Sequence, residues 1–219
     1  MNTDIISYYK ERAKEYETIY LKPERQHNLK SAASILQQIF SNKNIIEICC
    51  GTGYWTEKIA TTAASIFATD INDTVVEIAK HKNYLNNNVT FGIADFYSYE
   101  PVKQYESLFG GFIWSHIPLQ DLDNFIVRVN HCVLSGGAIV FMDNKFVAGS
   151  NLPVTETDEQ GNTFQTRLLQ DGSTHLVRKN FPSKEIVLEK LQHVAETIEF
   201  IELEYYWLVI CKTLPFQPV

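Results

Sequence analysis

Five short apolar runs alternate with amphipathic segments between residues 45 and 143, and this alternation constrains the fold more than any other feature. The runs cover residues 45–48, 64–69, 89–93, 108–114 and 138–142. The segments between them carry apolar residues at spacings of three and four, which is typical of helices. Strands that alternate with helices predict an α/β, doubly wound, mostly parallel sheet with right-handed crossovers. In such sheets ligands bind outside the carboxyl ends of the strands.

Further elements flank this alternating core. Helical spacing of apolar residues predicts helices over residues 3–20 and 24–40, with Pro23 between them. After a polar stretch at 144–160, Asp171-Gly172 separates two strand-like runs and predicts a hairpin. A helix over 183–194 and strands over 197–203 and 207–213 complete the pattern. Because no linker or repeat interrupts it, we expect one domain over residues 1–219.

Composition narrows the function further. The chain has 219 residues and a net charge of −7, which disfavours nucleic acid as a partner. Its four cysteines form no C-x-x-C pair and its six histidines show no metal-ligand spacing, so we expect no metal site. The first residues, MNTDIISYYK, lack the apolar core of a signal peptide, and no apolar run is long enough to span a membrane. These features predict a cytoplasmic protein without a membrane partner and leave its oligomeric state open.

A glycine loop follows the first strand of the core, in the stretch IIEICCGTGYWT at residues 45–56. A dinucleotide-binding loop would read G-x-G-x-x-G, but Thr56 occupies the position of its third glycine after Gly51 and Gly53. The phosphate-binding pattern that ends in G-K-[ST] is also missing here. An isolated G-x-G is weak evidence, so its neighbours decide which ligand it binds.

Four motifs in order resemble those of the class I SAM-dependent methyltransferases. The first is Glu47-Ile48-Cys49-Cys50-Gly51-Thr52-Gly53, with Cys49 in place of the family's first glycine. Asp70 follows the second strand, Ala94-Asp95-Phe96 follows the third, and Leu134-Ser135-Gly136-Gly137 precedes the fifth, with Ser135 in place of proline. The resemblance covers residues 8–145 and implies a Rossmann-like methyltransferase fold with N-terminal helices and an antiparallel C-terminal strand.

The resemblance also implies S-adenosyl-L-methionine (SAM) as the cofactor and S-adenosyl-L-homocysteine (SAH) as its product. The acid at Asp70 would accept hydrogen bonds from the ribose hydroxyls, and Asp95 and Phe96 would flank the adenine. The aromatic side chains would suit the sulfonium cation. The residues expected to bind the cofactor are Tyr16, Glu47, Gly51, Gly53, Trp55, Asp70, Ile71, Asp95, Phe96 and Trp114.

Several of these residues have a purely structural alternative. Asp70 could cap the next helix, although Asp73 is the better placed N-cap. Asp95 could be a turn residue, and Glu47 could pair with a buried basic group. The tryptophans could belong to the core.

Methyl transfer needs an acceptor, and the sequence suggests a small molecule that offers O or N. His116 follows the fourth strand and is the best candidate for a general base, although it could equally orient the backbone. We expect residues 1–40 to form a helical lid and residues 144–180, a loop and hairpin insertion, to form the far wall. Tyr9, Asn144 and Phe146 are the expected lining of a largely apolar or aromatic substrate pocket. Two alternatives remain: a SAM-binding protein without catalysis and, disfavoured by Thr56, a nicotinamide-dependent oxidoreductase.

Overall fold

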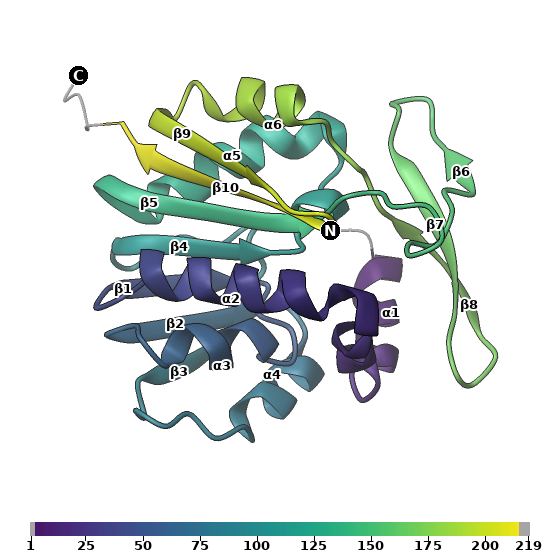
Figure 1. The fold of residues 1–219 in the computed structure, drawn as a ribbon, viewed down its shortest axis with the longest axis horizontal. Coiled ribbons are helices and arrows are strands. Elements are labelled where there is room, and N and C mark those ends of the chain that lie inside the picture. The colour runs from purple at the N-terminus through teal and green to yellow at the C-terminus, as the bar shows by residue number, and fades with distance from the viewer. Residues whose placement is uncertain (1–2, 215–219) are drawn as a thin grey trace.

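A seven-stranded sheet forms the centre of the protein in the computed structural model, which describes residues 3–214 (Figure 1). The strand order is β3-β2-β1-β4-β5-β10-β9. The strands are β1 (Asn44–Ile48), β2 (Ser65–Asp70), β3 (Val89–Ile93), β4 (Tyr105–Gly111), β5 (Val133–Asn144), β9 (Ala195–Glu202) and β10 (Tyr206–Thr213). The first five pair in parallel, whereas β10 is antiparallel to β5 and β9. This arrangement confirms the predicted Rossmann-like sheet with an antiparallel C-terminal strand.

Helices cover both faces of the sheet, because side chains alternate in direction along each strand. Ile45 faces the side that carries α2 (Gln26–Ile39) and α3 (Tyr54–Ala60). Its neighbour Ile46 faces α5 (Leu122–His131) and α6 (Lys184–Leu191). Both isoleucines are fully buried. The near-continuous apolar runs of the sequence follow from this two-sided burial.

A second, smaller sheet lies beyond the carboxyl ends of the main strands, next to α1 (Thr3–Arg12) (Figure 1). It consists of β6 (Glu156–Thr157), β7 (Thr163–Leu168) and β8 (Thr174–Arg178), all antiparallel. The predicted hairpin is therefore confirmed, whereas β6 lies in the stretch predicted to be a loop. Ile5 and Tyr8 of α1 pack with Leu169 and Val177 in a small core of their own. Helix α1 and the small sheet thus form one layer over the carboxyl ends of the main strands.

The helix predicted over residues 3–20 is interrupted. It ends at Arg12, and a 3-10 helix, η1 (Tyr16–Leu21), follows. Tyr20 stacks on Tyr54 of α3 with 3.8 Å between ring centroids, so tertiary aromatic packing overrides the helical spacing. A second 3-10 helix, η2 (Pro23–Arg25), then leads the chain into α2.

Three other predictions were wrong in detail. The fourth strand ends at Gly111 because Phe112 has a positive φ of 60°, and Trp114 lies in the 3-10 helix η3 (Trp114–His116). Gly136 and Gly137 lie inside β5 rather than before it, and a Cβ at Gly137 would meet the Glu106 carbonyl at 2.6 Å. Helix α4 (Asp73–Lys80) is capped by Asn72 and not by Asp73. Among residues 3–214, no helix is long and apolar enough to cross a membrane.

Candidate active site

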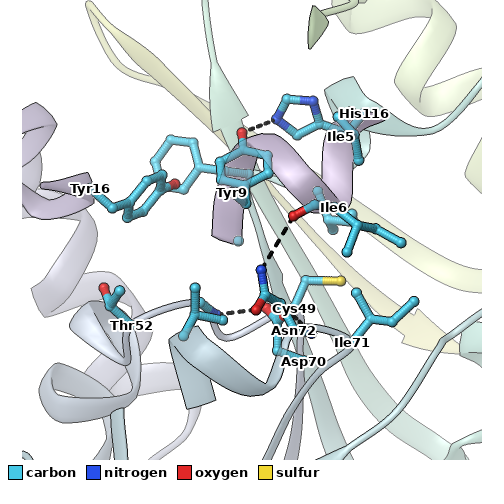
Figure 2. Close-up of a pocket in the computed structure, with 15 residues that line it drawn as sticks. Ile5, Ile6, Tyr9, Tyr16, Cys49, Thr52, Asp70, Ile71, Asn72 and His116 are labelled. Carbon is cyan, nitrogen blue, oxygen red and sulfur yellow. Dashed lines mark hydrogen bonds between the residues drawn. The ribbon is translucent and has the colours of Figure 1, made fainter. Parts of the chain in front are cut away.

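The glycine loop after β1 has an unusual backbone. Cys49 and Gly51 both adopt left-handed conformations, with φ of 53° and 55°. A non-glycine residue pays of order 1 kcal/mol for such a conformation, which clusters at functional sites. Asp70 at the end of β2 fixes the loop: its Oδ2 accepts a hydrogen bond from the Gly51 N–H at 2.9 Å (Figure 2). Its Oδ1 accepts another from the Asn72 N–H at 2.9 Å.

This loop forms one wall of a partly open cavity, here named the glycine-loop cavity. Figure 2 shows α1 opposite the loop, with Ile5, Ile6 and Tyr9 toward the space between them. The remaining lining residues are Tyr16, Cys49, Gly51, Thr52, Asp70, Ile71, Asn72, Val75, Gly111, Phe112, Ile113 and His116.

Gly53 serves packing rather than a ligand. It has a φ of 80°, and an added Cβ would lie 2.7 Å from the Tyr84 hydroxyl and 3.0 Å from the Ala79 Cβ. By contrast, a Cβ at Gly51 would meet no atom within 4 Å. Of the two glycines, only Gly51 therefore borders the cavity.

A smaller cavity adjoins the loop, and its lining includes Glu47, Trp55 and Tyr16. Glu47 is 2% exposed, and its Oε2 has no hydrogen-bond partner among residues 3–214. Burial raises the pKa of Glu47 to about 8. The expected buried basic partner is therefore not found in the described part of the chain, and a ligand donor would satisfy this oxygen.

His116 is buried at the end of η3 and uses both ring nitrogens. Nδ1 lies 2.6 Å from the Arg178 carbonyl oxygen, and Nε2 lies 2.8 Å from the Tyr9 hydroxyl (Figure 2). Since a carbonyl only accepts, Nδ1 carries the proton and Nε2 accepts from Tyr9. Burial, followed by the charges of Lys179 and Arg167, lowers the pKa of His116 well below 6.5. The ring is thus neutral at pH 7 and a weak base.

Behind His116 lies a buried ion pair. Lys179 Nζ contacts Asp143 Oδ1 at 2.8 Å, and both side chains are almost fully buried. The same ammonium donates to Ser115 Oγ at 2.5 Å, and Asp143 Oδ2 accepts from the Ser115 N–H at 2.9 Å. The network joins the end of β5 to the exit of β8, and so holds the small sheet against the main one.

A larger cavity lies between η1, η2 and the small sheet, and is here named the basic cavity. Five cationic side chains line it: Arg12, Lys22, Arg25, Arg167 and Lys179. No carboxylate belongs to its lining among the described residues. Aromatic side chains such as Tyr9 and Tyr16 also line it, so the expected apolar or aromatic lining is accompanied by cations that were not expected. The basic cavity shares Tyr9, Tyr16, Phe112 and His116 with the glycine-loop cavity, and these four residues are here named the shared wall.

The structure brings most of the predicted site residues together. Those that line one of the three cavities are Tyr9, Tyr16, Glu47, Gly51, Trp55, Asp70, Ile71, His116 and Asn144. Trp114 instead belongs to the core, 2% exposed and packed edge-on against Phe141 and Trp207. Phe146 is 48% exposed and lies against Phe181 outside these cavities.

Asp95 and Phe96 also lie outside the three cavities. The Oδ1 atom of Asp95 accepts from the Tyr97 N–H at 3.0 Å, as in the turn alternative, and Phe96 is buried and stacks on Tyr99. The five cations were missed because they are far apart in sequence. The sequence does carry one signal for them. Gln165 and Arg167 lie two residues apart in β7 and therefore share its inward face, so a cation at this position points toward the protein interior.

Comparison with known proteins identifies the class. Residues 45–137 match the family model described as a methyltransferase domain. Malonyl-[acyl-carrier protein] O-methyltransferase 1 of Ilyobacter polytropus is 28% identical over 170 residues, which cover 73% of this chain and 62% of that protein. A second protein of the same organism, malonyl-[acyl-carrier protein] O-methyltransferase 2, is 30% identical over 102 residues, which cover 45% of this chain and 38% of that protein. The chain thus spans less than two thirds of the length of these relatives.

Solved structures agree on the fold. A DhpI–SAH complex superposes with a TM-score of 0.76 at 24% identity over 97% of both chains. A DhpI–SAM–HEP complex gives 0.78 at 23% identity over 97% of this chain and 99% of the other. The fold is that of the Rossmann-like methyltransferases. Residues 45–137 thus form a methyltransferase domain, in agreement with the resemblance to the SAM-dependent methyltransferases.

Proposed function

We propose that this protein transfers the methyl group of SAM to an oxygen or nitrogen of a small molecule. One observation carries the proposal: two cavities at the carboxyl ends of the strands meet at the shared wall. A transfer reaction needs two reactants side by side, and their alignment alone can contribute on the order of 7–11 kcal/mol. The glycine-loop cavity would take SAM, and the basic cavity would take the acceptor.

The residues of the glycine-loop cavity fit the cofactor. Asp70 would accept hydrogen bonds from the ribose hydroxyls while it holds the Gly51 N–H. The left-handed backbone at Cys49 and Gly51 leaves the loop open toward the cavity. The unsatisfied Oε2 of Glu47 in the adjoining cavity would accept a hydrogen bond from the amino end of the ligand.

When bound, SAM supplies a methyl group already activated on a sulfonium sulfur. The chain's own task is to align the acceptor and exclude water. We propose residues 1–40 as the lid, because Tyr9 and Tyr16 from this segment belong to the shared wall. Residues 144–180 would form the far wall through Asn144, Gln165 and Lys179. His116 would orient Tyr9 and could take a proton from a neutral acceptor.

Calorimetry with SAM, SAH and NAD tests the cofactor assignment. We expect SAM and SAH to bind and NAD to give no heat, since the family match leaves the oxidoreductase alternative without support. A panel of small molecules, with product formation read by mass spectrometry, then tests transfer. SAM binding without any methylated product would favour the non-catalytic alternative.

A further inference from the structure

The lining of the basic cavity points to the chemistry of the acceptor. We propose that the acceptor is a small molecule with a carboxylate, phosphate or phosphonate group, that the cationic side chains of the basic cavity bind this oxyanion, and that one of its oxygens receives the methyl group. The inference rests on the methyl transfer proposed above and specifies its substrate class.

Most of the cations in the basic cavity have no ion-pair partner among the described residues. Of its five cations, Lys179 alone forms an ion pair within residues 3–214, with Asp143. Arg25 instead contacts the Asn144 amide oxygen and the Ser150 hydroxyl, which donates in turn to Glu24. Positive charge therefore accumulates in one cavity of a chain whose net charge is −7. Such a concentration of one sign attracts an anion.

Burial makes this arrangement unfavourable without a ligand. Arg25 is only 6% exposed and has no carboxylate partner, and a buried charge without a counter-charge is costly. Arg167 donates to the Tyr8 hydroxyl and the Gln165 amide oxygen, but its buried Nε has no partner among the described residues. A bound oxyanion would supply both the counter-charge and acceptor oxygens, and bonds of this kind are strong.

The cations also lie close to the place of reaction. The charges of Lys179 and Arg167 reach His116 of the shared wall, where they lower the pKa of its ring. Arg167 donates to the Tyr8 hydroxyl. The ring of Tyr8 in turn contacts the ring of Tyr9 in the shared wall, with 5.0 Å between their centroids. An oxyanion held by these two cations therefore lies next to the glycine-loop cavity.

An acceptor oxygen that is already ionised needs no strong base, which agrees with the weak basicity of His116. The oxygen contributes the electron pair of the new O–C bond, while the C–S bond breaks and its electron pair stays on sulfur. The acceptor loses one negative charge, the sulfonium loses its positive charge, and no proton is released. Since such an anion has more than one equivalent oxygen, one can contact the cations while another faces the methyl group.

Anion binding can be measured without catalysis. Inorganic phosphate and malonate are titrated separately into SAH-loaded protein, with Arg167→Met, Arg12→Met and the control Arg128→Met. Arg128 lies on α5, where it pairs with exposed Glu100. We expect at least one anion to bind the wild type, with affinity reduced roughly 10- to 100-fold in Arg167→Met, reduced less in Arg12→Met, and unchanged in Arg128→Met. No anion binding, or equal binding by all variants, would overturn the inference.

Turnover then separates the sources of the oxyanion. The panel pairs carboxylates, phosphates and phosphonates with their neutral amides or esters, and mass spectrometry locates the added methyl group. We expect the anions alone to react and the product to be a methyl ester, whichever of the three classes reacts fastest. A neutral analogue methylated as fast as its anion would overturn this inference but leave the proposed methyl transfer intact. Bound anions without any methylated product would support the site and contradict the transfer.

Discussion

The two cavities that meet at the shared wall are built in different ways. The loop wall of the glycine-loop cavity is held by short-range contacts, such as the bond between Gly51 and Asp70, 19 residues apart. The basic cavity depends on long-range contacts: Arg25 bonds to Ser150, 125 residues away, and Arg167 to Tyr8, 159 residues away. The loop wall of the first cavity is a local consequence of two adjacent strand ends. The second exists only after the N-terminal segment and the small sheet have come together.

The electrostatics differ as well. The glycine loop is bordered by acids whose pKa values burial raises, Glu47 and Asp70. The basic cavity is bordered by cations and by one ion pair. An acidic cavity suits a cofactor with a cationic centre, and a basic one suits an anionic partner. The predictions below test this division of roles.

The largest effect is expected at the ion pair below the basic cavity. Lys179→Met leaves the carboxylate of Asp143 buried and unpaired, so the free energy of unfolding should fall by about 3–5 kcal/mol. Denaturant unfolding measures it. Lys190→Met is the matched control, because Lys190 contacts Asp123 at the same 2.8 Å on the surface and should change stability by about 1 kcal/mol or less.

The double variant Lys179→Met, Asp143→Asn removes the unpaired charge and should recover part of the loss. If Lys179→Met and Lys190→Met destabilise equally, the pair does not hold the small sheet as described.

Glu47, beside the glycine loop, should make the stability of the protein depend on pH. Its folded pKa of about 8 lies above its unfolded value, so its contribution to stability is complete in acid and is lost as the pH rises toward 8. Relative to Glu47→Gln, the ligand-free protein should lose roughly 3–4 kcal/mol between pH 5 and pH 8, at about 1.4 kcal/mol per unit. Unfolding midpoints of both proteins across this range measure it. Parallel curves would mean that Glu47 is ionised throughout.

A smaller effect is expected for the cofactor. Asp70→Ala should weaken SAM binding by roughly 1.5–3 kcal/mol through the loss of charge-assisted hydrogen bonds. Asp73→Ala is the control, because Asp73 lies three residues away with a side chain 72% exposed. Calorimetry compares the two, and Asp70→Asn, which keeps an acceptor oxygen for Gly51, separates ligand binding from loop structure. Unchanged affinity in a folded Asp70→Ala variant would place the ribose elsewhere.

The contrast between the cavities explains what the sequence could and could not predict. Strand β3 (Val89–Ile93) has the predicted bounds, because apolar periodicity and the glycine loop are local signals. For the same reason Gly51 and Asp70 were found at the glycine-loop cavity. No local pattern states that Arg25 will meet Asn144, 119 residues away. The net negative charge of the chain further concealed the basic cavity, since a total charge says nothing of its distribution.

The smallest effect concerns the helix that serves both cavities. Tyr9→Phe removes the hydroxyl that His116 Nε2 accepts from, which leaves a buried acceptor unpaired and should loosen α1 by about 0.5–1.5 kcal/mol. Hydrogen exchange of the α1 amides measures local opening. Ser7→Ala is the control on the same helix, where the hydroxyl bonds to Glu11 in solvent at 3.1 Å and contributes little. If α1 is a lid that ligands close, SAH should slow exchange in the wild type and in Tyr9→Phe alike, because binding stabilises the closed form by mass action. Exchange of α1 that SAH leaves unchanged would make the helix a fixed wall instead of a lid, and the two cavities would then be filled without its movement.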